Sequence, residues 1–172
     1  SKSQIFLLIL SLFLITDLRI IFLYENSMQL FFDEAQYWGW SKQIDFGYYS
    51  KPPMIAWLIA ISTSFCGDEE FCIRYSSPIL HFGTAIAVFI LANKLYDRKI
   101  AIYSSLAYIT LPAVSLSSMF ISTDVPLLFF YAWAMVFFVY ALEKKYFSLW
   151  LITGAVAGLG MLSKYNMLAF AF

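Results

Sequence analysis

Five apolar stretches of this chain are each long enough to cross a lipid bilayer as a helix. They cover residues 5–24, 75–96, 100–119, 125–142 and 149–170. A bilayer core is crossed by roughly 20 helical residues, and a helix satisfies its own backbone polar groups there. Hydrophobic residues make up 62% of the 172 residues and charged residues 13%, more apolar surface than a domain in water can bury. The sequence therefore predicts an all-α integral membrane protein with several spans.

The loops between these stretches differ in charge. One set contains Lys2, Lys94, Arg98, Lys99, Lys144 and Lys145, against Asp97 and Glu143. The opposite set, residues 25–74 and 120–124, is mainly acidic. The positive-inside rule places the basic set in the cytoplasm and both acidic loops outside. The net charge is zero and no basic stripe occurs, which argues against a nucleic-acid partner.

The outer loop over residues 25–74 is expected to contain helices that lie at the membrane interface. One runs from Asp33 to about Ile44 with an amphipathic pattern. The apolar segment from Pro53 to Cys66 is too short to span, so it suits an interfacial or re-entrant helix. Cys66 and Cys72 lie in a compartment that permits disulfides. Two alternatives stay open: a bridge, or Cys66 buried in the interfacial helix.

Two adjacent carboxylates, Asp33 and Glu34, stand among five aromatic rings in the stretch FFDEAQYWGW. An ordinary explanation exists, because Asp33 and Gln36 have the spacing of a helix capping box and aromatic residues often form an interfacial belt. That explanation does not say why both acids occur together beside Tyr37 and Trp38. We therefore treat this stretch as a candidate site.

Three further charged residues are predicted at the same membrane face. Lys51 precedes Pro52 and Pro53, which restrict the backbone after it. Asp124 has an ordinary role as the N-cap of the span that follows it. Lys164 falls inside an apolar run, where a lysine is costly and usually faces a cavity or a partner. Carboxylates beside lysines suit an enzyme that handles a lipid phosphate, because lysines hold the phosphate while a carboxylate takes a proton or binds a metal.

Five motifs carry a resemblance to a known family. In chain order they are DEAQYWGWS, GYYSKPPMIAWLI, GDEEFCIRYSSPIL, STDVPLLFF and GLGMLSKYNM. Over residues 5–170 the chain resembles the amino-terminal part of bacterial GT-C glycosyltransferases related to protein O-mannosyltransferases and lipid A aminoarabinose transferases. The resemblance implies a GT-C-type helical bundle in the bacterial inner membrane. Its members are longer, so residues 1–172 are expected to be part of a transmembrane domain.

The resemblance also implies an activity. It is that of an inverting glycosyltransferase that moves a sugar from a polyprenyl-phosphate donor to a lipid, glycan or protein acceptor at the periplasmic face. The residues expected to serve it are Asp33, Glu34 and Asp124 in catalysis, Lys51 and Lys164 at the donor phosphate, and Tyr37, Trp38, Tyr48 and Tyr49 at the substrate. No cofactor is certain; a divalent metal, if required, would use Asp33 and Asp124. Ser50 stands where the aminoarabinose transferases carry Glu before the Lys-Pro pair, which leaves the sugar open.

A transporter or channel subunit is the alternative. Such a protein should show broken helices lined with polar groups through the middle of the membrane. Here the midplane is expected to be nearly free of polar groups apart from Ser and Thr. Asp17, Arg19 and His81 are expected away from the centre. This pattern favours the transferase.

The charge bias generates a test of orientation. A cysteine placed at Ser122 should react with a membrane-impermeant thiol reagent added from outside, because the loop over residues 120–124 is predicted to be periplasmic. If the cysteine is labelled only after the inner membrane has been opened, the predicted orientation of the candidate site is wrong.

Overall fold

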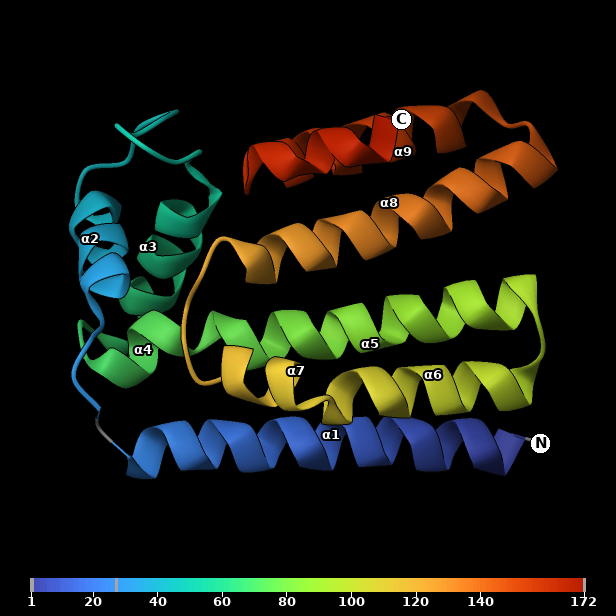
Figure 1. The fold of residues 1–172 in the computed structure, drawn as a ribbon, viewed down its shortest axis with the longest axis horizontal. Coiled ribbons are helices and arrows are strands. Elements are labelled where there is room, and N and C mark those ends of the chain that lie inside the picture. Colours follow the sequence, from blue (N-terminus) through green and yellow to red (C-terminus); the bar gives the residue numbers. More distant parts are fainter. Residues whose placement is uncertain (1, 27, 172) are drawn as a thin grey trace.

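The computed structural model describes residues 2–26 and 28–171. Ser1, Ser27 and Phe172 lie outside this description; Ser27 belongs to the expected outer loop, and Phe172 is the last residue of the sequence. The described residues form helices and no strand. The long elements are α1 (Lys2–Glu25), α5 (Ser76–Leu95), α6 (Arg98–Thr110), α8 (Asp124–Lys144) and α9 (Phe147–Met161). They lie side by side, and α2 (Phe32–Ser41), α3 (Met54–Cys66) and α4 (Glu70–Arg74) gather at one end of the bundle (Figure 1).

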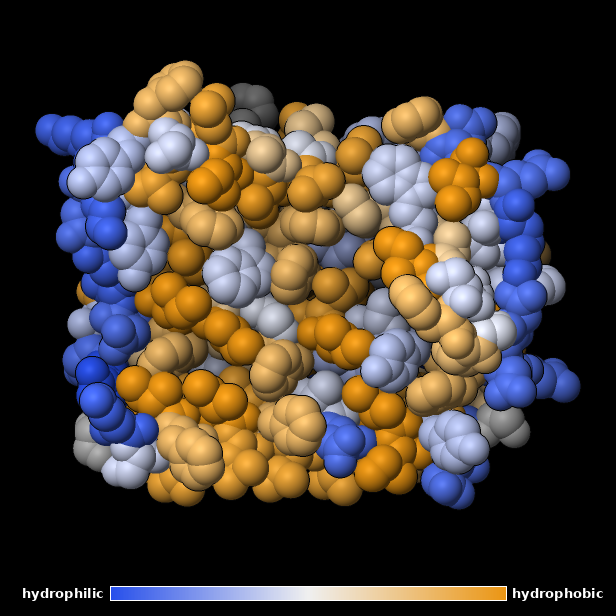
Figure 2. Space-filling view, turned by 180° about the vertical axis from the view of Figure 1, so that it is seen from behind, coloured by the Kyte–Doolittle hydropathy of each residue, from blue (hydrophilic) through white to orange (hydrophobic). Residues whose placement is uncertain are grey.

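The outer surface of the bundle matches a lipid environment. Figure 2 shows a broad hydrophobic band with hydrophilic residues at its two ends. Within the described residues, three helical stretches are long and apolar enough to cross a membrane: Lys2–Glu25, Glu70–Leu95 and Asp124–Lys144. Large side chains such as Phe6 and Phe13 on α1 are exposed. Exposed apolar surface on this scale is stable in lipid and costly in water, so the predicted all-α membrane fold is confirmed.

The two ends of the bundle differ in charge. We call the end that carries α2, α3 and α4 the acidic end, since Asp33, Glu34, Asp68 and Asp124 lie there. The opposite end, called the basic end, contains the turns between α5 and α6 and between α8 and α9 (Figure 1). Its cations are Lys94, Arg98, Lys99, Lys144 and Lys145. The fold thus collects at each end the charges that the sequence assigned to separate loops.

Two of the five expected spans are not continuous helices. The stretch over residues 100–119 is divided into α6 and α7 (Pro112–Ser117), because Leu111 adopts an extended backbone before Pro112. The stretch over residues 149–170 ends as a helix at Met161, and the 3-10 helix η1 (Tyr165–Ala171) then turns back along the bundle (Figure 1). Gly160 permits this turn, since a Cβ there would stand 2.7 Å from the Met167 sulfur.

Buried polar side chains stabilise the break between α6 and α7. Arg19 of α1 donates hydrogen bonds to the Ile109 carbonyl at 2.5 Å and to the Ser115 hydroxyl at 2.8 Å. The ring of His81 on α5 is hydrogen-bonded to the Tyr108 hydroxyl at 2.8 Å. The end of α6 leaves carbonyl groups without helical partners, which is costly inside a membrane. Arg19 therefore has a structural explanation.

Helices α2, α3 and α4 form a small domain at the acidic end, which we call the cap. The cap has its own small core. Tyr37, Ile55, Ile59, Ile73 and Ile121 pack together there, contributed by α2, α3, α4 and the segment between α7 and α8. All five side chains are almost completely buried. Burial of this kind contributes roughly 1.5–3 kcal/mol for each large apolar side chain. The cap is thus held to the bundle by packing as well as by chain connection.

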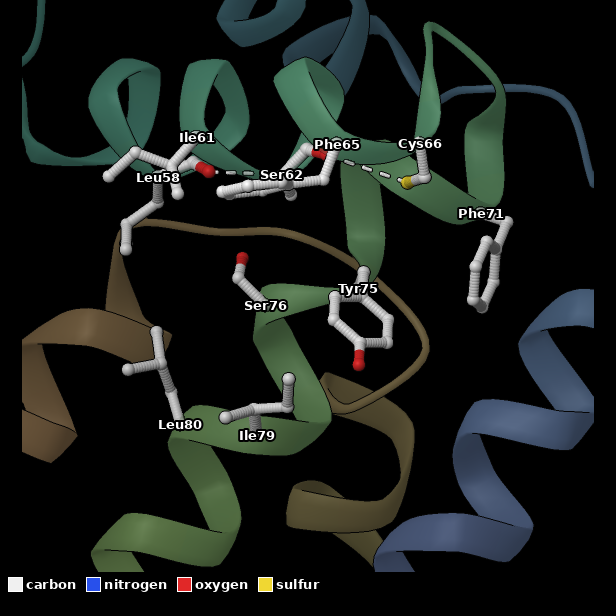
Figure 3. Close-up of a pocket in the computed structure, with 10 residues that line it drawn as sticks. All are labelled: Leu58, Ile61, Ser62, Phe65, Cys66, Phe71, Tyr75, Ser76, Ile79 and Leu80. Atoms are coloured by element: carbon white, nitrogen blue, oxygen red, sulfur yellow. Dashed lines mark hydrogen bonds between the residues drawn. The ribbon is translucent and has the colours of Figure 1, made fainter.

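An apolar groove runs between this cap and the spanning helix α5. Its volume is about 610 Å³, and its walls include Leu58, Ile61 and Phe65 of α3 and Ile79 of α5 (Figure 3). The Ser76 hydroxyl points into the space between these walls and has no hydrogen-bond partner among the described residues. In the sequence the α3 residues belong to a predicted interfacial helix and Ile79 to a predicted span, and only the fold brings them together as a groove.

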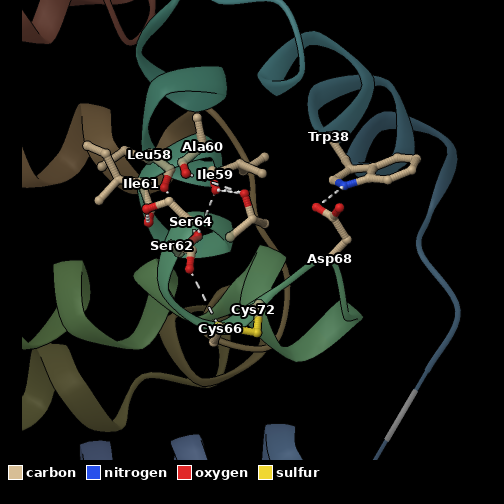
Figure 4. Close-up of a disulfide and its surroundings, with 11 residues drawn as sticks. Trp38, Leu58, Ile59, Ala60, Ile61, Ser62, Ser64, Cys66, Asp68 and Cys72 are labelled. Atoms are coloured by element: carbon tan, nitrogen blue, oxygen red, sulfur yellow. Dashed lines mark hydrogen bonds between the residues drawn. A yellow bond between two sulfur atoms is a disulfide. The ribbon is translucent and has the colours of Figure 1, made fainter.

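A disulfide between Cys66 and Cys72 joins α3 to α4 (Figure 4). Of the two alternatives left open by the sequence, the structure therefore forms the bridge. The loop that it closes contains Asp68, which accepts hydrogen bonds from the Trp38 indole at 3.1 Å and from the Lys42 ammonium. These bonds, the one from Lys42 first, lower the pKa of Asp68. The bridge thus fixes the loop that fastens α2 to the rest of the cap.

Candidate functional site

The helix that carries the adjacent carboxylates begins one residue earlier than the sequence predicts. Phe31 is its N-cap, and the Phe31 N–H donates to the Glu34 carboxylate at 3.1 Å. The predicted capping box between Asp33 and Gln36 is therefore wrong, because Glu34 occupies the third helical position and makes the bond back to the cap. Asp33 lies in the first turn with an exposed side chain and no capping bond.

Glu34 forms a buried ion pair with Arg74 of α4. Two parallel contacts join them, from Arg74 Nη2 to Oε2 at 2.7 Å and from Nε to Oε1 at 2.9 Å. The Ile121 N–H also donates to Oε1 at 2.9 Å. The two side chains are only 2% and 3% exposed. Because both carboxylate oxygens are occupied, the geometry favours a positioning role for Glu34 over the catalytic role expected from the sequence.

Arg74 was not singled out in the sequence, although it is central to this arrangement. Besides its two bonds to Glu34, it donates to the backbone carbonyls of Met28 at 2.9 Å and Gln29 at 3.1 Å. The one available signal was an arginine in a mainly acidic loop, set among apolar residues just before a span. Its contacts join α4 to α2 and to the segment that follows α1.

Asp33 lies on the wall of a groove of about 450 Å³. Phe32 and Tyr37 of α2 line the same groove, together with Phe120 and Ser122 from the segment before α8. Tyr37 is only 3% exposed and packs into the core of the cap. The groove therefore has a rigid wall on which Asp33 presents a carboxylate.

Asp124 approaches the same region from the start of α8. Burial raises the pKa of Tyr37, and the negative charges of Asp33 and Asp124 raise it further. Asp124 is the first residue of α8, while Thr123 occupies the N-cap position without a side-chain hydrogen bond. The expected N-cap role of Asp124 is therefore wrong, because the helix begins at Asp124 itself, one residue earlier than that role requires.

Lys164 forms an ion pair with Asp124. Its Nζ atom lies 2.6 Å from Asp124 Oδ1, and the two side chains are 29% and 56% exposed. Such an accessible pair contributes little to stability. Lys164 stands in the turn between α9 and η1 rather than inside a spanning helix, so its ammonium reaches the end of the bundle. The pair accordingly brings a cation to the carboxylates.

Lys51 lies in the turn between α2 and α3, next to the segment that holds Lys164. Its carbonyl accepts a hydrogen bond from the Tyr48 N–H at 3.1 Å, and the Met54 N–H donates to the Leu162 carbonyl at 3.0 Å. Two lysines therefore come from neighbouring turns. The Lys51 ammonium makes no hydrogen bond or ion pair with residues 2–26 or 28–171. It is available to a ligand.

The four aromatic residues predicted to contact substrate have different surroundings. Tyr37 lines the groove, whereas the Trp38 indole is hydrogen-bonded to Asp68. Tyr48 stacks on Trp40 with ring centroids 4.9 Å apart, and its hydroxyl donates to a backbone carbonyl. Tyr49 is fully exposed. The contacts of Trp38 and Tyr48 therefore stabilise the cap. The amino-acid composition alone does not distinguish this structural role from contact with a substrate.

The charged groups allow only a limited metal site. Among the described residues, no group of three or more His, Cys, Asp or Glu side chains could hold a metal ion. Asp33 lines the groove, and Asp124 follows the segment that forms its other wall. Magnesium is often bound by one or two carboxylates together with substrate phosphates and water. The role of these two residues as metal ligands stays a prediction.

Comparisons with known proteins show that the chain is similar to glycosyltransferases. Residues 50–172 match the family described as dolichyl-phosphate-mannose-protein mannosyltransferase. Lipid A galacturonosyltransferase RgtD of Rhizobium johnstonii is 41% identical over 151 residues, covering 87% of this chain and 32% of the relative. The lipopolysaccharide core galacturonosyltransferase RgtA of the same organism is 26% identical over 161 residues, covering 92% of this chain and 32% of the relative.

A third relative has a different sugar in its name. The undecaprenyl phosphate-alpha-4-amino-4-deoxy-L-arabinose arabinosyl transferase of Pseudomonas savastanoi pv. phaseolicola is 26% identical over 121 residues, 68% of this chain and 23% of the relative. The chain spans about a third of the length of RgtD and RgtA. No solved structure matches the chain.

The buried ion pair generates a prediction on stability. Glu34→Gln keeps the size of the side chain but leaves the Arg74 guanidinium buried without a countercharge. Loss of one partner of a buried pair costs roughly 3–5 kcal/mol. We therefore expect a clearly lower midpoint of thermal unfolding in detergent and faster proteolysis of the loop over residues 25–74.

Glu69→Gln is the matched control, since Glu69 is exposed and makes no side-chain bond at the start of α4. It should unfold like the wild type. A Glu34→Gln protein as stable as this control would show that the pair does not hold the cap.

Proposed function

The chain belongs to the dolichyl-phosphate-mannose-protein mannosyltransferase family, and we propose that it carries the catalytic carboxylate of an inverting membrane glycosyltransferase. The sugar comes from a polyprenyl-phosphate donor, and the acceptor is reached at the periplasmic face of the bacterial inner membrane. One observation carries this proposal. Lys164 is paired with Asp124 at the acidic end of the bundle, and the accessible Asp33 lies there on the wall of a groove that Ser122, just before α8, also lines.

Asp33 is the group proposed to take the proton. The acceptor hydroxyl oxygen forms a bond to the anomeric carbon of the sugar, while the bond from that carbon to the phosphate oxygen breaks on the opposite face. The electron pair of the broken bond leaves with the polyprenyl phosphate, and the hydroxyl proton passes to Asp33. Its accessible carboxylate suits this step, whereas that of Glu34 is already bonded to Arg74 and to the Ile121 N–H. A positioned base contributes roughly 10²–10⁴-fold in rate.

Lys51 and Lys164 are proposed to hold the phosphate that leaves. An ammonium group has three N–H donors, and Lys164 uses one of them on Asp124. The others, with those of Lys51, can bind phosphate oxygens as the negative charge on the leaving group grows. Asp124 then orients Lys164 and limits its motion. In this proposal Asp33, Lys51, Lys164 and Asp124 all act at the reacting bonds, whereas Glu34 does not.

The groove between α3 and α5 supports a donor with an isoprenoid chain. Its walls are apolar (Figure 3). One wall is formed by α3, which packs against α2, the helix that carries Asp33. Each CH₂ group removed from water contributes roughly 0.8 kcal/mol, but a lipid tail is already in an apolar solvent. The groove therefore serves to place the chain rather than to supply affinity, leaving phosphate recognition to the lysines.

The sugar and the acceptor are the finer part of the proposal. We propose a hexuronate as the sugar and a lipid A-type glycolipid as the acceptor. The support is the 41% identity to a lipid A galacturonosyltransferase, against 26% to an aminoarabinose transferase. Ser50, which precedes Lys51, also differs from the Glu that the aminoarabinose transferases carry at this position, and this difference likewise argues against aminoarabinose as the sugar. Assays with both polyprenyl-phosphate sugars should give faster transfer from the hexuronate donor; transfer from the aminoarabinose donor alone would contradict this choice.

The polar groups inside the bundle do not favour a transporter. Arg19 and His81 are buried, and their hydrogen bonds go to the backbone and hydroxyls around the break between α6 and α7. A conducting path needs polar groups that remain available to the ion or solute. These groups are occupied by the fold, so the transferase accounts better for the charged residues.

The role of Asp33 is tested by Asp33→Asn in the complete membrane protein. Because Asp33 makes no capping bond, the amide should leave the fold, membrane insertion and donor binding nearly unchanged. Transfer should fall by roughly 10²–10⁴-fold, the contribution of a positioned base. Lys51→Ala and Lys164→Ala should weaken donor binding as well. Radiolabelled sugar transfer and donor-lipid binding are the two measurements.

Asp45→Asn provides the matched control, since Asp45 is an exposed carboxylate in the turn after α2 and lies outside the groove. It should retain normal transfer. If Asp33→Asn also transfers at a near-normal rate, Asp33 is not the base.

A further inference from the structure

We propose that the basic end of the bundle contains a binding site for an anionic phospholipid of the cytoplasmic leaflet, in a cleft between α1 and α6. The cleft has a volume of about 490 Å³. Arg98 and Lys99 at the start of α6 form its charged part, and Leu7 of α1 with Ile102 and Leu106 of α6 form its apolar walls. It lies at the opposite end of the bundle from Asp33, so this inference does not depend on the proposed function.

The two cations have no countercharge within the part of the chain that the structure describes. Neither Arg98 nor Lys99 forms an ion pair there. The carboxylate next to them in the chain, Asp97, caps α6 by accepting a hydrogen bond from the Ile100 N–H at 2.9 Å. The other nearby acid, Glu143, is paired with Lys94. Positive charge at the cleft is therefore left for a ligand.

The apolar walls indicate that the ligand is a lipid. Arg98 or Lys99, Ile102 and Leu106 follow one another at helical spacing, so the cleft passes from charge to apolar surface along α6. Leu7 on the facing helix is 58% exposed, which is ordinary for a side chain in contact with acyl chains. A phosphodiester head group at the cations and acyl chains along the walls would match both parts. Basic pockets between membrane helices on the cytoplasmic side bind anionic head groups in this way.

The positive-inside rule alone does not explain this arrangement. It accounts for cations in a short cytoplasmic loop, but it requires no cleft between helices. Lys144 and Lys145 satisfy the same rule at the same end of the bundle and do not line the cleft. Lys144 instead lies over the Tyr140 ring, 5.6 Å from its centroid. A comparison of the two pairs of cations therefore distinguishes specific binding in the cleft from general attraction to an anionic surface.

The test measures lipid binding by the purified complete protein in neutral detergent. Phosphatidylglycerol and phosphatidylcholine with the same acyl chains are titrated, and bound lipid is counted by native mass spectrometry. We expect the wild type to prefer phosphatidylglycerol. In Arg98→Gln/Lys99→Gln its affinity should fall by roughly 10- to 30-fold, since each cation near a membrane surface contributes about 1 kcal/mol. Lys144→Gln/Lys145→Gln removes the same charge and should keep nearly the wild-type affinity.

Two further measurements locate the site and identify its ligand. Ile102→Trp adds a ring on the cleft-facing side of α6 without changing charge, and it should also lower the affinity for phosphatidylglycerol. Glycerol phosphate has the head-group charge without acyl chains, and it should not displace the lipid. Equal losses in the two charge variants, full binding by Ile102→Trp, displacement by glycerol phosphate or equal binding of phosphatidylcholine would each overturn the proposal.

Discussion

The buried contact between Glu34 and Arg74 connects parts of the chain that are far apart in sequence. An ion pair removed from solvent is costly unless the remaining hydrogen-bonding groups of both partners are also satisfied. Here backbone groups of Phe31, Ile121 and Met28 complete the arrangement. The pair therefore stabilises one relative position of α2, α4 and the segment before α8. That position in turn places Asp33, which neighbours Glu34, beside the segment that leads to Asp124.

Breaks in the helices bring charged residues to the membrane surface. A lysine within a continuous span would have to be buried in lipid or paired inside the bundle. The chain instead leaves α9 at Met161 and turns, so that Lys164 lies at the acidic end and meets Asp124. The break between α6 and α7 differs, because there the buried Arg19 donates a hydrogen bond to the buried carbonyl of Ile109. Irregular backbone is thus found where polar side chains or solvent can satisfy it.

Much of this arrangement is predictable from the sequence. Hydropathy predicts the membrane fold, because apolar length is a direct requirement of the bilayer. Charge and motif spacing predict that Asp33, Lys51, Asp124 and Lys164 share one end of the bundle, and the fold brings the last two into contact. Expectations failed where a single residue of register mattered. Helix α2 begins at Phe32, and this shift of one position makes Glu34 a buried partner of Arg74 while leaving Asp33 accessible.

Other features depend on tertiary contacts that a sequence does not contain. An apolar run gives no sign that it will turn back at residues 162–164, since the turn depends on Gly160 accommodating Met167. The sequence does not distinguish the roles of the aromatic residues in the outer loop. Tyr37 lines the groove, whereas the Tyr48 hydroxyl donates a hydrogen bond to a backbone carbonyl in the turn after α2. The pairing of Glu34 with Arg74, 40 residues apart, has no local signature.

The central claim is that the phosphate of a polyprenyl donor lies between Lys51 and Lys164 beside Asp33. Solid-state NMR can measure the proximity of the donor phosphorus to ¹⁵N-labelled lysine ammonium groups in the complete membrane protein. Phosphorus-dependent dephasing of two lysine signals is expected, one lost in Lys51→Arg and the other in Lys164→Arg. Two dephased lysine signals in either variant, or dephasing that belongs to Lys94, Lys144 or Lys145 at the basic end, would contradict the account.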